Sequence, residues 1–174
     1  MKSKSRPQEQ LEAFALSLRI RHPSIDPAEL TSAFGVEPLH SFRAGDPRNG
    51  PGQRSGSSRH TGSYWLADLK EGLPFAVMSP ASGFPPNAVD ALRESRKRLE
   101  TMVGENLGLA LNVLVMRVLQ PRASLLERLR AEEGEVALLI EVNTVVAEPF
   151  SLAPQVLKGL ADLGITIEFE FSGN

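Results

Sequence analysis

Apolar and polar residues alternate in five separate segments of the chain, and this pattern predicts a fold built on a sheet. In residues 14–20 every second side chain is large and apolar, which is the period of a strand with one buried face. Comparable patterns predict strands at about 36–44, 63–68 and 136–142. The last segment, 165–171, alternates most clearly, because isoleucine and phenylalanine take turns there with threonine and glutamate.

Helices are predicted where apolar residues recur every three or four positions between capping residues. Asp26 is suited to cap a helix that starts at Pro27 and ends at Gly35, and Glu29 is placed to complete a capping box. Further helical patterns occupy residues 87–103, 107–119, 121–134 and 151–163.

Two stretches, 14–44 and 136–171, follow the same plan of strand, Pro-started helix, glycine and strand. Each strand needs one covered face, so two such units predict an α+β fold. We expect a two-layer sandwich of ferredoxin-like type, with a mainly antiparallel sheet and helices on one face. Segment 107–119 is apolar on nearly all sides and fits either a buried helix or a central strand. We favour the helix.

Composition predicts one domain with three less regular segments. Residues 1–12 are expected to be a disordered tail, and residues 13–174 a single domain. Within it, residues 45–63 change abruptly to Gly, Ser, Pro, Asn and Arg, which predicts a mobile loop without apolar anchors. Residues 70–104 are expected to be an insertion.

The chain has 174 residues, of which 41% are hydrophobic and none is cysteine. It can therefore bury a substantial core, but it forms no disulfide, thiol nucleophile or Cys-based metal site. No metal and no cofactor is expected, and the lack of disulfides fits a cytoplasmic location. The apolar run 107–119 falls short of the roughly 20 residues that span a bilayer, so no membrane association is expected. The oligomeric state stays open.

Several motifs together resemble one bacterial family. They are His22–Asp26, Glu29–Thr31, Phe34–Pro38, Ser41–Asp46, Ser63–Trp65 and Gly164–Ile165. In these motifs the chain resembles the family called domain of unknown function 4279, over residues 14–68 and 107–172. Phe42 stands where that family commonly shows tryptophan. The resemblance implies an α+β fold and an immunity-like role beside secreted toxins, and it supplies no catalytic residues.

A basic loop is the leading candidate for a binding surface. Four arginines lie in or beside the predicted loop, at Arg43, Arg48, Arg54 and Arg59. Guanidinium groups pair well with carboxylates, and a loop that orders on contact can wrap a partner. We therefore expect a non-enzymatic binding module that recognises an acidic protein partner.

A small enzyme or ligand-binding protein is the alternative, with an anionic small molecule in a cleft near Arg43. Its working side chains would be His40, Arg43 and Asp46. The two hypotheses differ in whether these three side chains converge on one pocket.

Single-stranded nucleic acid is a third hypothesis, because Tyr64 and Trp65 at the exit of the loop could stack a base. The net charge of −2 argues against it, since dedicated nucleic-acid binders are basic. Trp65 is more typical of a ring that seals a sheet against helices. The glycine-rich segment 50–56 has neither the spacing of a dinucleotide fingerprint nor the Lys-Ser/Thr pair of a P-loop.

Overall fold

The computed structural model describes residues 13–48, 58–69, 106–145 and 149–173. Within these residues, one five-stranded sheet has the spatial order β2-β3-β1-β4-β5. The strands are β1 (Phe14–His22), β2 (His40–Phe42), β3 (Ser63–Asp68), β4 (Glu135–Asn143) and β5 (Thr166–Ser172). Neighbouring strands are antiparallel except β4 and β5, which run parallel. The predicted α+β class and mainly antiparallel sheet are confirmed.

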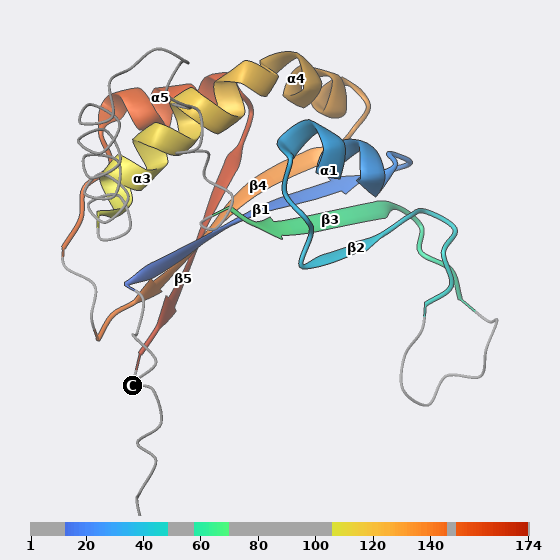
Figure 1. The fold of residues 1–174 in the computed structure, drawn as a ribbon, viewed down its shortest axis with the longest axis horizontal. Coiled ribbons are helices and arrows are strands. Elements are labelled where there is room, and N and C mark those ends of the chain that lie inside the picture. The colour runs from blue at the N-terminus through green and yellow to red at the C-terminus, as the bar shows by residue number, and fades with distance from the viewer. Residues whose placement is uncertain (1–12, 49–57, 70–105, 146–148, 174) are drawn as a thin grey trace, which may run out of the picture.

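The described helices lie on one side of the sheet (Figure 1). They are α1 (Pro27–Phe34), α3 (Leu107–Leu114), α4 (Ala123–Ala131) and α5 (Pro154–Asp162), with a π-helical turn at Val115–Leu119 and a 3₁₀ turn at Gln120–Arg122. On β1, the side chains of Leu16, Leu18 and Ile20 are almost inaccessible to solvent, whereas the residues between them are partly exposed. The core therefore fills the space between the helices and one face of the sheet.

The two strand–helix–strand units differ in their pairing, and this was not predicted. In the first unit, β3 lies between β1 and β2, whereas β4 and β5 of the second unit are direct neighbours. A parallel neighbour requires a crossover connection, and α5 lies in that connection. The sheet is therefore mixed, and the repeated sequence plan corresponds to two different local topologies.

Helix α1 begins and ends where the sequence predicts. The Asp26 carboxylate accepts a hydrogen bond of 2.9 Å from the Ala28 N–H, and Pro27 lies in the first turn. Gly35 follows the helix at a φ of 69°, a left-handed conformation that glycine adopts without a steric penalty. Local sequence thus sets both ends of this helix.

Two arginines tie α1 to the helices packed beside it. Arg128 of α4 pairs with Glu29, so the predicted capping box is wrong: a long-range partner engages this carboxylate, which raises the pKa of Arg128. Arg122 donates to the carbonyl oxygens of Ala33 at 2.6 Å and Phe34 at 3.4 Å. Its guanidinium carbon also lies 5.2 Å from the centre of the Phe34 ring. Partial burial lowers the Arg122 pKa.

A continuous helical run extends from Leu107 to Ala131 and confirms the helix predicted for 107–119. By length and composition alone, this run would suffice to cross a membrane. In the fold, however, Leu111, Leu114 and Leu119 are fully buried against other elements. The apolar character of the run therefore has a direct explanation in core packing.

Two predicted strands differ in detail. β2 has three residues rather than the predicted range 36–44, and Leu39 just before it is 66% exposed. β5 (Thr166–Ser172) is shifted by one residue from its predicted range of 165–171, and Phe171 is 64% exposed because the end of this edge strand extends away from the described helices (Figure 1). The predicted tail 1–12, the helix 87–103 and the insertion 70–104 lie outside the described residues.

Candidate functional site

The β2–β3 pairing assigns the candidate residues to two sides of the sheet. The register pairs Ser41 with Trp65 and Phe42 with Tyr64. Trp65 is fully buried, so it faces the helices. Because successive strand residues point to opposite faces, Phe42, Tyr64 and His40 lie on the side of the sheet that faces away from the described helices, called here the helix-free side.

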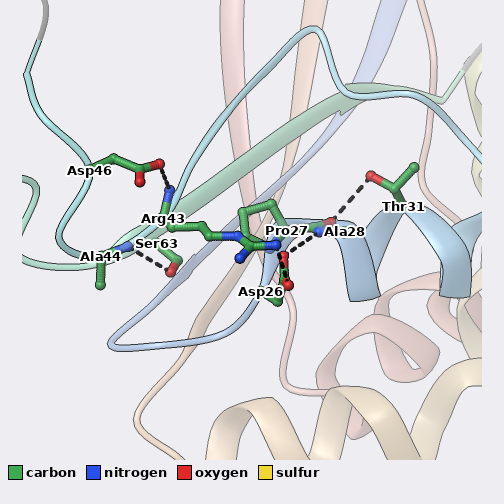
Figure 2. Close-up of polar contacts among 8 residues, drawn as sticks. All are labelled: Asp26, Pro27, Ala28, Thr31, Arg43, Ala44, Asp46 and Ser63. Carbon is green, nitrogen blue, oxygen red and sulfur yellow. Dashed lines mark hydrogen bonds and ion pairs between the residues drawn. The ribbon is translucent and has the colours of Figure 1, made fainter.

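Arg43 follows β2 and reaches the start of α1. Figure 2 shows its guanidinium against the Asp26 carboxylate, with which it forms an ion pair. The same carboxylate accepts the Ala28 N–H, so Asp26 both caps the helix and holds Arg43. Both side chains of the pair are about half exposed, so solvent limits its contribution to stability to less than about 1 kcal/mol.

Asp46 is engaged by the backbone of the turn that follows β2. Its carboxylate accepts the Arg43 N–H at 2.8 Å, while the Ala44 N–H donates to the Ser63 hydroxyl oxygen at 3.1 Å (Figure 2). These two bonds fix the backbone between β2 and the loop. The Asp46 carboxylate therefore has a structural role.

The two ends of the predicted mobile loop pair with each other. The Gly45 N–H donates to the His60 carbonyl at 2.8 Å, and the Arg48 N–H donates to the Ser58 carbonyl at 3.1 Å. The Arg59 guanidinium donates to the Gly45 carbonyl at 2.6 Å. This backbone ladder extends the β2–β3 hairpin without needing apolar side chains, and for that reason composition did not reveal it.

One cleft, called here the Arg43 cleft, lies between the start of α1 and β2 and has a volume of about 600 Å³. Its lining residues are Asp26, Pro27, Ala28, Thr31, Glu37, Pro38, Ser41, Phe42, Arg43 and Asp46. His40 is not among them. His40 thus lies apart from Arg43 and Asp46, and the three residues of the enzyme hypothesis do not converge.

Replacing Asp26 by Ala is expected to lower the free energy of unfolding by about 1–2 kcal/mol, because α1 loses its cap and Arg43 its partner. Asp26→Asn should cost less than half as much, since asparagine caps a helix equally well. Urea denaturation of the two variants measures this difference. Equal losses in both would assign the effect to the charge rather than to the cap.

Four rings form an aromatic cluster on the helix-free side, made of His40, Phe42, His60 and Tyr64. The Phe42 ring stacks on His60 with 3.6 Å between centroids, and on Tyr64 with 5.2 Å and nearly parallel planes. The His40 ring lies 5.8 Å from Tyr64 at a tilt. The cluster joins β2, β3 and the loop end into one continuous surface.

A second cleft, called here the Arg48 cleft, opens beside this cluster and has a volume of about 390 Å³. Its lining residues are Arg21, His22, Pro23, Phe42, Arg48, His60, Thr61, Gly62, Ser63, Tyr64, Glu133 and Glu135. Arg21 is 56% exposed in its side chain, and one of its nitrogens lies 4.0 Å from a Glu135 oxygen. Arg48 is exposed as well. The cleft combines an aromatic wall with two arginines and two glutamates.

His22 stands at the edge of the Arg48 cleft and is buried. Its Nδ1 accepts the N–H groups of Ser24 at 3.1 Å and Ile25 at 2.8 Å, so the neutral ring carries its proton on Nε2. That nitrogen lies 3.2 Å from a Glu132 carboxylate oxygen, but without the alignment of a hydrogen bond. The ring therefore shapes the turn between β1 and α1.

Two predicted site residues remain, Trp65 and Arg54. Trp65 is fully buried, and its Nε1 donates to the Thr31 hydroxyl at 3.1 Å, so this ring cannot stack a ligand from outside. Arg54 lies outside the described residues. Among the residues described, no group of three His, Asp or Glu side chains is placed to hold a metal ion.

No motif in the sequence singled out Arg21 or Glu135. A signal for Arg21 was present, because strand alternation puts it on the polar face of β1. Its neighbours could not be inferred, since the register that sets Arg21 between Tyr64 and Glu135 joins three strands distant in sequence.

Comparisons with family models, curated proteins and solved structures each gave no significant match to the chain. The resemblance to the domain of unknown function 4279 family therefore stays a prediction.

Proposed function

We propose that this protein is a non-enzymatic binding module that recognises an acidic protein partner through basic side chains beside the β2–β3 hairpin. The observation that carries the proposal is the separation of His40 from Arg43 and Asp46. Arg43 is held by Asp26, and Asp46 is engaged by backbone. This arrangement suits a surface fixed for recognition better than a set of acid and base groups aimed at one substrate.

The basic residues divide into those that build the surface and those that are available to a partner. Arg43 and Arg59 hold the hairpin through Asp26 and the Gly45 carbonyl. Arg48 is exposed, and no acidic side chain of the described residues pairs with it. A pre-formed arginine surface of this kind binds carboxylates at a lower entropic cost than a free loop would.

The finer architecture and family are part of the same proposal. The strand order β2-β3-β1-β4 is that expected of a ferredoxin-like sandwich, to which β5 is added at one edge. We propose that the chain is related to the domain of unknown function 4279 family and works in the cytoplasm in an immunity-like role. The role is tested by the identity of the neighbouring reading frames, among which we expect a toxin gene, and by recovery of that toxin with the tagged protein.

Replacing Arg48, Arg54 and Arg59 together by Ala is expected to weaken partner binding and to flatten its dependence on salt. Charges at exposed sites steer association, and salt screens them over roughly 10 Å at 0.1 M. Affinity is measured by titration of the recovered partner at two salt concentrations. A matched control removes three exposed cations from the helix side, at Arg117, Arg130 and Lys158.

The control triple variant should bind as the parent does, while the loop variant loses affinity. Urea denaturation confirms that both variants fold. If the loop variant binds with the parent's affinity at both salt concentrations, the basic surface has no part in recognition and the proposal is wrong.

A further inference from the structure

The Arg48 cleft has an aromatic wall that an acidic protein partner does not require. Phe42 and Tyr64 stand with nearly parallel rings on the helix-free side, and His60 stacks behind Phe42. In the sheet register, the next residue beyond Tyr64 is Arg21 of β1. Among the described residues, no ring stacks in parallel on the face of Tyr64 towards β1, and one Arg21 nitrogen lies 4.0 Å from a Glu135 oxygen of β4. A flat ligand ring can stack against such a wall.

The cations of this cleft suit one phosphate group. Arg21 and Arg48 both line the cleft and are both exposed. The 4.0 Å separation of Arg21 from Glu135 is at the outer limit of an ion pair, so the guanidinium can turn to a ligand at little cost. Guanidinium forks bind phosphate oxygens in pairs.

The two carboxylates of the cleft limit which groups a ligand can carry besides one phosphate. Glu133 and Glu135 line it together with the arginines. A carboxylate accepts hydrogen bonds from the amino group of a base. Along the same sheet face, Arg19 of β1 is already paired with Glu168 of β5, and Glu141 follows on β4, so the positive charge available to a ligand ends at Arg21 and Arg48. A chain of phosphates would meet these glutamates, whereas a single phosphate would not.

We propose that the Arg48 cleft binds a free purine mononucleotide, with the base against Tyr64 and the phosphate at Arg21 and Arg48. The volume of about 390 Å³ lies within the range of roughly 300–1,000 Å³ of small-molecule pockets. This site goes beyond the proposed partner binding. It shares Arg48 with the basic surface, but it needs the Tyr64 ring in addition, which partner binding does not.

Calorimetric titration of the full chain with AMP tests the site. Adenosine, inorganic phosphate and an eight-nucleotide single strand serve as comparison ligands. AMP is expected to bind at least about tenfold more tightly than adenosine or phosphate, because only AMP engages both the wall and the arginines. The single strand should bind no more tightly than AMP.

Variants separate the two halves of the site. Tyr64→Leu should weaken AMP about tenfold or more, since stacking on an aromatic ring is lost, while Tyr64→Phe should restore most of the affinity. Arg48→Ala should weaken AMP but leave adenosine unchanged, and Arg117→Ala on the helix side should change neither. Circular dichroism shows which variants are folded. Because Arg48 is exposed and lies outside the strands, Arg48→Ala tests the site even if Tyr64→Leu fails to fold.

Three outcomes overturn the proposal: no AMP binding at millimolar concentration, unchanged AMP affinity in both Tyr64→Leu and Arg48→Ala, or tighter binding of the single strand than of AMP. The last would point to a nucleic-acid interface. Titration of the acidic partner with Tyr64→Leu keeps the two proposals distinct, because this variant retains every charge of the loop.

Discussion

Replacing Trp65 by Ala is expected to lower the free energy of unfolding by about 3–5 kcal/mol, the range for removal of a large buried aromatic side chain. The ring is fully buried between the sheet and α1, where it stacks on Phe34 at 5.4 Å between centroids. Its Nε1 also donates to the Thr31 hydroxyl. Both the packing and this hydrogen bond are lost together in the variant. Equilibrium denaturation in urea measures the change.

Two further variants divide this loss into its parts. Trp65→Phe keeps a large ring but leaves the Thr31 hydroxyl without its donor, so it should cost less than the alanine variant. Thr31→Val leaves the indole N–H without an acceptor and should cost about 1–3 kcal/mol, the penalty for a buried unsatisfied polar group. A melting temperature for Trp65→Ala equal to that of the parent would contradict the burial described here.

Replacing Leu138 by Ala is expected to lower the free energy of unfolding by about 2–5 kcal/mol. Leu138 lies in β4 between Leu18 of β1 and Ile167 of β5, and its side chain is fully buried beneath the helices. Truncation leaves a cavity in the middle of the sheet that neighbouring strands can fill only in part. The effect is measured by the same urea titration.

Leu139 provides the matched control for this experiment, because it is the next residue of the same strand and faces the helix-free side. Its side chain is partly exposed. Leu139→Ala should therefore cost clearly less than Leu138→Ala. Equal costs at the two positions would contradict the assignment of Leu139 to the less covered face of the sheet.

The candidate site was only partly predictable from sequence. Arg43, Arg48 and Arg59 were recognised as basic residues near a hairpin, but their different partners depend on residues far away in the chain. Arg43 forms an ion pair with Asp26, which lies 17 positions earlier in the chain. Arg48 stays exposed because its neighbours across the ladder contribute backbone rather than carboxylates. Residue type indicated the charge, while the fold determined which charges are available.

The sequence by itself determined the local elements of this protein. Local interactions set these elements, because the residues involved are only a few positions apart in the chain. Examples are the strand periods, the Asp26 cap, Gly35 and the Gly164 turn with its φ of 68°. The tertiary structure alone decided the strand order, the parallel pairing of β4 with β5 and the meeting of Tyr64, Arg21 and Glu135 in one cleft. These contacts join residues distant in sequence, and their register is set by the packing of the whole core.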